Sequence, residues 1–142
     1  MWRYRSVSPR RLLQGTWRFD AKRTIAEYRP PKGASRNLAR KMFGGRHPMT
    51  IKYTAKYLRW RYRMLDDRAS YKVIHGRRGT PILPPKITIA YAIPFMGMNL
   101  KYRSEITFES PDVFWWPLKR GREYFRRVPP NNSLQRRAEL GR

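Results

Sequence analysis

The side chains in this sequence that can do chemistry are mainly its cations. The chain has 33 Lys and Arg residues, 24 of them Arg, against 9 Asp and Glu residues, and its formal net charge is +24. The Arg guanidinium is planar and always charged, and it can bind two phosphate oxygens at once. A compact chain with this charge repels itself, so the sequence predicts a polyanionic partner. Nucleic acid, an anionic membrane surface and an acidic protein are the candidates.

Patterns that support catalysis or metal binding are missing from the sequence. The chain has no Cys, which excludes disulfides, Cys-ligated zinc and Cys nucleophiles. His47 and His75 lie far apart and have no second ligand at metal-binding spacing. The adjacent carboxylates of Asp66 and Asp67 fit ion pairs with nearby Arg side chains better than a metal site. We therefore predict a protein without enzymatic activity, metal, cofactor or small-molecule substrate.

The positive charge is distributed unevenly along the chain. Residues 80–118 hold 3 basic and 3 acidic residues, whereas residues 1–49 hold 13 and 2, and residues 119–142 hold 8 and 2. The neutral segment is predicted to form the core or to contact other proteins, and the flanks to contact a polyanion. We divide the chain into a basic N-terminal extension over 1–19, a small domain over 20–118 and a basic C-terminal extension over 119–142.

The predicted N-terminal extension is rich in Arg, contains Ser and has no acidic residue before Asp20. Mitochondrial targeting sequences have these features. We expect a protein of the mitochondrial matrix whose basic N-terminus stays uncleaved and is held by a partner. A basic extension without any targeting role is the alternative.

Capping signals predict three short helices. Asp20 is suited to cap a helix over 21–28, because its carboxylate can accept a hydrogen bond from the first turn. Ser35 is suited to cap a second helix over 36–43, which a Gly pair ends. A third helix is predicted over 134–140.

Strand signals dominate the neutral segment. Polar and apolar residues alternate strictly over 100–109, as expected for a strand with one wet face. An apolar run rich in β-formers precedes it. Together they predict a β-hairpin over 86–109, closed by residues 94–99. A further short strand is predicted over 71–75.

Residues 50–67 form the longest candidate element. Apolar residues and basic residues each follow the helical spacing of three and four, on two different faces. A strand is the competing interpretation, because residues 59–64 alternate strictly and are rich in β-formers. Length favours the helix. The predicted fold class is therefore α+β: a small mixed domain with a β-hairpin, one longer helix, short helices and extended basic termini.

Basic residues alternate with aromatic residues over 2–5, 59–63 and 122–127. Aromatic rings can stack on unpaired bases while Arg holds phosphates, which suits single-stranded or irregular RNA. Trp60 and Tyr62 are instead expected in the core. The predicted RNA-binding residues are Arg3, Arg5, Arg10, Arg11, Arg18, Arg36, Arg40, Lys41, Arg59, Arg61, Arg63, Arg77, Arg78, Arg120, Arg122, Arg126, Arg127, Arg136 and Arg137.

Phe114, Trp115 and Trp116 form a dense aromatic patch inside the neutral segment. Such a patch can belong to the core, to a protein interface or to a membrane anchor, since Trp favours the level of lipid headgroups. We interpret these three residues as a protein or membrane interface.

Taken together, these features predict a structural RNA-binding component of a large ribonucleoprotein particle. A small, Arg-rich chain without Cys is similar in composition to the proteins of organellar ribosomes, so the expected role is a mitochondrial ribosomal protein. Its partners would be rRNA, whose phosphates it neutralises and braces, and neighbouring proteins. The alternative is an accessory subunit of a mitochondrial inner-membrane complex, with the aromatic patch at the membrane and basic flanks on anionic lipid.

Overall fold

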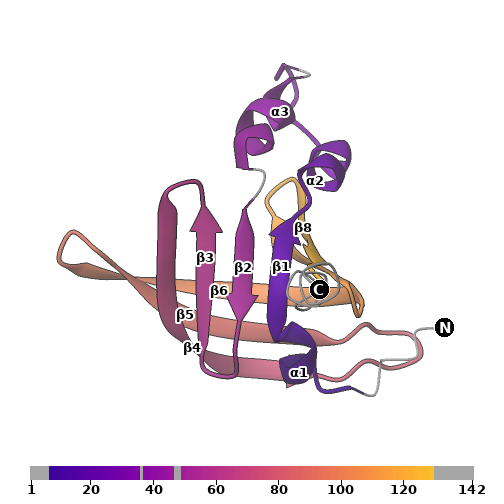
Figure 1. The fold of residues 1–142 in the computed structure, drawn as a ribbon. Helices are drawn as coiled ribbons and strands as arrows, with labels where there is room; N and C mark the ends of the chain where they lie inside the picture. Colours follow the sequence, from indigo (N-terminus) through magenta and orange to yellow (C-terminus); the bar gives the residue numbers. More distant parts are fainter. Residues whose placement is uncertain (1–6, 36, 47–48, 130–142) are drawn as a thin grey trace, which may run out of the picture.

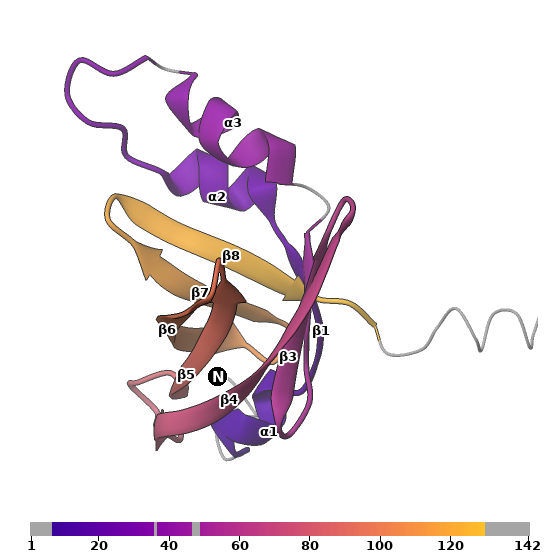
Figure 2. The same cartoon turned by 90° about the vertical axis from the view of Figure 1, so that its left-hand side faces the viewer.

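The protein is an all-β barrel. The computed structural model describes residues 7–35, 37–46 and 49–129. In these ranges, antiparallel strands follow one another around a closed barrel in sequence order, and β8 pairs with β1 to complete the ring (Figures 1 and 2). The predicted α+β fold class is therefore wrong. The strands are β1 (Gly15–Phe19), β2 (Thr50–Tyr53), β3 (Tyr57–Tyr62), β4 (Leu65–Arg77), β5 (Lys86–Phe95), β6 (Met98–Ser110), β7 (Val113–Leu118) and β8 (Gly121–Arg127).

The long helix predicted over residues 50–67 does not form. That segment contains β2, β3 and the start of β4, joined by tight turns. Along β3, Leu58 faces the interior and is buried, while the next residue, Arg59, lies on the outer face. The strict alternation of β-forming residues thus prevailed over the helical spacing, because a strand on each side supplies the backbone hydrogen bonds that the helix would have made internally.

Short helices occupy the two ends of the barrel (Figure 1). Helix α1 (Pro9–Leu13) precedes β1, while α2 (Ala21–Glu27), α3 (Leu38–Phe43) and the 3₁₀ turn η1 (Gly44–Arg46) lie between β1 and β2. The predicted cap of α2 is confirmed, because the Asp20 carboxylate accepts a hydrogen bond of 3.0 Å from the Arg23 backbone N–H. The helix predicted over 36–43 begins later than expected, at Leu38.

The β-hairpin predicted over 86–109 is confirmed. Strands β5 and β6 pair continuously from Lys86 opposite Thr107 to Phe95 opposite Met98. The connecting turn is shorter than expected, since only Met96 and Gly97 lie between the strands, both with positive φ. Positive φ at both central residues is the geometry of a type I′ turn, which matches the twist of the two strands.

Segments that the sequence pattern placed in the basic extensions form parts of the barrel. Residues 9–13 and 15–19 are α1 and β1, and residues 121–127 are β8. The strand predicted over 71–75 lies within β4, and the helix predicted over 134–140 lies outside the described residues.

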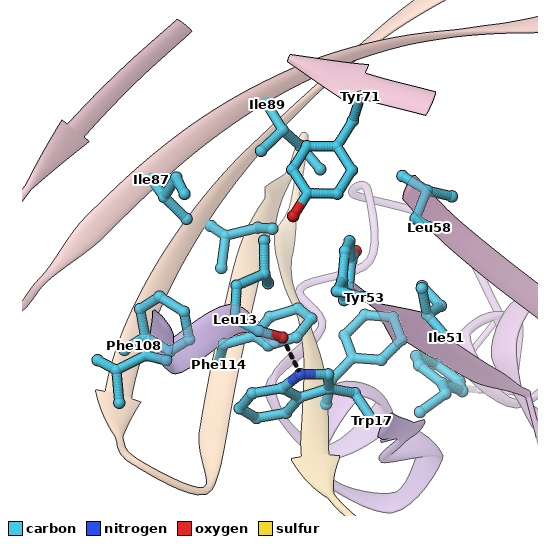
Figure 3. Packing of buried hydrophobic residues seen from close by; sticks show 14 of the residues in the cluster. Leu13, Trp17, Ile51, Tyr53, Leu58, Tyr71, Ile87, Ile89, Phe108 and Phe114 are labelled. Carbon is cyan, nitrogen blue, oxygen red and sulfur yellow. Dashed lines mark hydrogen bonds between the residues drawn. The ribbon is translucent and has the colours of Figure 1, made fainter. Parts of the chain in front are cut away.

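Aromatic side chains pack together in the core of the barrel (Figure 3). The rings of Trp17 and Phe114 meet edge to face with centroids 4.6 Å apart, and Phe114 stacks on Phe125 at 4.9 Å. The indole Nε1–H of Trp17 donates to the backbone oxygen of Leu13 at 2.8 Å, which ties α1 to the core. Aromatic pairs of this kind contribute about 0.5–1.5 kcal/mol beyond the area they bury.

The half-buried side chain of Arg127 links the first and last strands where the barrel closes. Arg127 lies opposite Trp17 in the β8–β1 pairing, and its guanidinium carbon is 4.3 Å from the centroid of that ring. Its nitrogens donate to the backbone oxygens of Leu12 at 2.5 Å, Gln14 at 2.9 Å and Pro111 at 3.0 Å. Burial lowers the pKa of Arg127, so the hydrogen bonds to these oxygens offset a real cost of desolvation.

Gly15 makes room for this guanidinium. Its φ is +129°, and a Cβ at this position would lie 2.7 Å from Nη1 of Arg127. Both the backbone conformation and the close approach therefore require glycine here.

We expect Arg127→Ala to lower the free energy of unfolding by about 2–4 kcal/mol, because it leaves three backbone oxygens, two of them in part-buried hydrogen bonds, without their donor. The matched control is Arg126→Ala, the next residue on the outer face, whose exposed ion pair with Asp20 is worth roughly 1 kcal/mol or less. Urea unfolding followed by circular dichroism measures both. Equal losses for the two variants would show that Arg127 does not hold the closure together.

Candidate polyanion-binding surface

Six cations from neighbouring strands share the outer face of the barrel. We call them the basic belt, and they come from β8, β1, β2, β3 and β4 in that order around the ring. The members of the basic belt are Arg126, Arg18, Lys52, Arg59, Arg61 and Arg68.

Strand pairing brings these side chains close together. Arg126 lies opposite Arg18, and Arg59 lies opposite Lys52 on one side and opposite Arg68 on the other. Directly opposed residues of antiparallel strands have Cα atoms only about 4.5–5.5 Å apart. Like charges in such positions destabilise a sheet. Three directly opposed cation pairs therefore work against the stability of the barrel.

Two carboxylates neutralise part of the basic belt. Asp66 receives two hydrogen bonds from Arg59, at 2.7 and 2.6 Å, and its Oδ2 lies 3.4 Å from Nε of Arg61. The hydrogen bonds from Arg59 lower the pKa of Asp66, because they favour the charged carboxylate. Asp20 accepts from Arg126 at 2.6 Å while it also caps α2.

The remaining cations of the basic belt face outward, and no carboxylate of the described residues pairs with them. Within the described ranges, the exposed side chains of Arg18 and Lys52 make no ion pair with a protein carboxylate. The guanidinium of Arg68 lies over the ring of Tyr57, with its carbon 5.1 Å from the ring centroid. These three positions can donate hydrogen bonds to an external anion without first breaking an ion pair.

The aromatic residues that alternate with these cations in the sequence point the other way. Trp60 packs against the hydrophobic core from the inner face of β3. Tyr62, at the end of the same strand, donates a hydrogen bond to the backbone oxygen of Gly45. The basic belt therefore offers cations on a β-surface rather than a row of rings on which bases could stack.

The other predicted RNA-binding residues are scattered. Arg10 and Arg11 lie exposed on α1, Arg40 and Lys41 on α3, and Arg63 at the turn after β3. Residues Arg3, Arg5, Arg36, Arg136 and Arg137 lie outside the described residues.

The predicted cations at strand ends have local contacts. Arg77 donates to the backbone oxygen of Pro84 at 2.8 Å, and the neighbouring Arg78 lies at the surface. Arg122 lies over the ring of Trp115 with its guanidinium carbon 3.9 Å from the centroid, and Arg120 accepts a backbone hydrogen bond from Arg29. Arg127, also predicted to bind RNA, has its guanidinium bonded to the protein backbone instead.

The aromatic patch predicted as an interface divides between the two faces of β7. Phe114 is fully buried in the core, and Trp116 packs on it from the inner face while donating to the Glu123 carboxylate at 2.9 Å. Trp115 lies on the outer face beneath Arg122.

Neither a metal site nor a helical membrane anchor emerges from the described residues. These ranges contain no group of three or more His, Cys, Asp or Glu side chains that could hold a metal ion. Nor does any helix there combine the length and apolar character needed to cross a lipid bilayer. The expected absence of metal and of catalysis stays a prediction.

Sequence reasoning missed two members of the basic belt, Lys52 and Arg68. Lys52 falls in the segment predicted as a helix over 50–67 and Arg68 directly follows that segment, and a helix would place neither residue directly opposite Arg59. The alternation with a period of two over 59–63 was the sequence feature that could have indicated them. It is typical of a strand, and a hairpin on each side of that strand brings Lys52 and Arg68 opposite Arg59.

Comparison with models of protein families, with curated protein sequences and with solved structures finds no match for this chain. The function must therefore be argued from its charges and geometry.

We expect Asp66→Asn to tighten binding to polyphosphate roughly two- to fivefold at low salt, because it releases Arg59 and Arg61 from their shared counter-ion. The matched control is Glu105→Gln, which removes the same charge from the outer face of β6, away from the basic belt. Fluorescence anisotropy with a labelled polyphosphate measures both affinities. An equal gain for the two variants would mean that only net charge matters.

Proposed function

We propose that this protein binds RNA through the basic belt and serves as a non-enzymatic structural component of a ribonucleoprotein particle. The observation that carries this proposal is the set of like-charged residues placed directly opposite one another on β8, β1, β2, β3 and β4. Such an arrangement costs stability in the free protein and is compensated when closely spaced phosphates lie against it.

The kind of cation supports phosphate as the ligand. Five of the six members of the basic belt are Arg, whose forked guanidinium matches two oxygens of one phosphate. The strands hold these side chains on a rigid surface, so less conformational entropy is lost when RNA binds than for a flexible tail.

The chemistry of the surface also supports recognition without sequence preference. Contacts to phosphates position a protein on a nucleic acid but carry no base information. Because Trp60 lies on the inner face of the barrel, stacking on splayed bases contributes little at the basic belt. The matching RNA surface is a backbone of closely packed phosphates, as in the folded RNA of a large particle.

The proposed setting is the mitochondrial ribosome, with rRNA and neighbouring ribosomal proteins as partners. The supporting observations are the net charge of +24, the Arg excess and the acid-free stretch before Asp20. A protein that neutralises rRNA phosphates there needs neither cofactor nor substrate.

We expect the triple variant Arg18→Ala/Lys52→Ala/Arg68→Ala to bind a folded RNA much more weakly than the wild type. If each cation neutralises one phosphate, the slope of log affinity against log salt becomes shallower by roughly 2–3, since each contact contributes about 0.7–0.9. The measurement is a salt titration of binding by anisotropy with a labelled RNA hairpin.

The control variant removes three exposed cations from the region of α2 and the loop that follows it: Lys22→Ala/Arg29→Ala/Lys32→Ala. It has the same net charge as the first triple variant. The proposal requires the control to retain most of the wild-type affinity and slope. Equal losses of affinity in both triple variants would show that RNA binding depends only on net charge. The basic belt would then not be the binding site.

A further inference from the structure

Three large apolar side chains are exposed around the turn between β5 and β6. Phe95, Met96 and Met98 are 54%, 85% and 61% exposed. No Lys, Arg, His, Asp or Glu occurs from Ile87 to Leu100. We call residues 94–98 the hairpin tip. Figure 1 shows this turn extending away from the barrel at the left of the view.

The two faces of this hairpin differ in chemistry. One face carries three cross-strand pairs of apolar or aromatic residues, and the outermost pair is Phe95 with Met98. The innermost pair is Tyr91 with Tyr102, whose rings stack with centroids 5.6 Å apart. The opposite face carries the exposed side chain of Lys101, opposite Ala92.

From the tip to the base of the hairpin, the side chains change from apolar to aromatic and charged, as the layers of a bilayer surface change from acyl chains to headgroups. Apolar side chains come first, the tyrosine pair follows, and the exposed cations Lys101 and Arg103 lie at the level of that pair. Tyr favours the boundary between headgroups and acyl chains, and cations next to it attract anionic lipid. Because β5 and β6 pair up to Phe95 and Met98, the backbone groups that face each other across the hairpin are satisfied within it.

We propose that the hairpin tip inserts shallowly into the surface of an anionic lipid bilayer. The depth would be about 5–10 Å, as for other interfacial elements, with Phe95, Met96 and Met98 in the acyl boundary. The occupant is a bilayer because the tip has no charged group to specify a protein surface, while the cations behind it and the net charge of +24 match anionic headgroups. The basic belt lies on other strands, so the two surfaces can act separately.

The absence of Cys from the chain allows a direct test, because one introduced Cys is the only labelling site. Met96→Cys carrying the polarity-sensitive dye NBD is mixed with vesicles of phosphatidylcholine, with or without phosphatidylglycerol. The expected result is a blue shift with anionic vesicles and little change with neutral ones. The matched control is Met64→Cys at the β3–β4 turn, where Met64 is 97% exposed, and we expect no shift there.

Substitution of Met96 and Met64 measures how much the hairpin tip contributes to binding of anionic vesicles. We expect Met96→Asp to lower partitioning into anionic vesicles roughly tenfold or more, because an inserted Met side chain is lost. Met64→Asp makes the same change of charge at another exposed turn and should lower it by no more than about fivefold. Met96→Asp, on a hairpin away from the basic belt, should bind RNA like the wild type.

Three results would overturn the insertion of the hairpin tip. They are the absence of a blue shift at position 96, an equal shift at position 64, and equal partitioning of the two Asp variants. Loss of RNA binding in the basic-belt variant, with the blue shift at position 96 unchanged, would show that the two proposals stand independently.

Discussion

The barrel depends on how its first and last strands are joined. Arg127 on β8 covers the indole of Trp17 on β1 and donates hydrogen bonds to the backbone oxygens of Leu12 and Gln14, just before that strand begins. Gly15 leaves the space through which the guanidinium passes. Because β8 pairs with β1, the ring has no first or last strand left at an edge, and such terminal edges are a common route by which strands associate with those of other chains. The same contacts hold α1 against the aromatic core, through Leu12 and Leu13.

Closure also decides which cations meet. Once β8 pairs with β1, Arg126 lies opposite Arg18, although more than one hundred residues separate them in the chain. The alternation of each strand then sends Arg59 and Arg61 outward and the intervening Trp60 inward. Closure therefore brings cations of distant segments together, and the alternation keeps the ring of Trp60 away from them, while the ring of Tyr57 lies beneath Arg68. The sheet carries the electrostatic cost of that surface, and the proposed RNA partner relieves it.

Local signals in the sequence predicted local features. The alternation over 100–109 predicted a hairpin that the structure contains, and Asp20 predicted the cap of α2. The segment 50–67 was misread because two stripes at helical spacing coincided with a strict period of two over 59–64. Only pairing with strands on both sides decides between them, and a single sequence does not show that pairing. The closure of the barrel and the role of Arg127 could not be predicted, because nothing in a single sequence distinguishes a half-buried Arg from an exposed one.

The central claim is that RNA phosphates lie against the basic belt, and NMR can locate them residue by residue. The side-chain Nε–Hε resonances of Arg report directly on contact with phosphate. During titration with a short RNA duplex, the account predicts the largest shifts at Arg18, Arg61 and Arg68, and small shifts at Arg103 and Arg122. Shifts spread evenly over all exposed Arg side chains, or concentrated at Arg103 and Arg122, would contradict it.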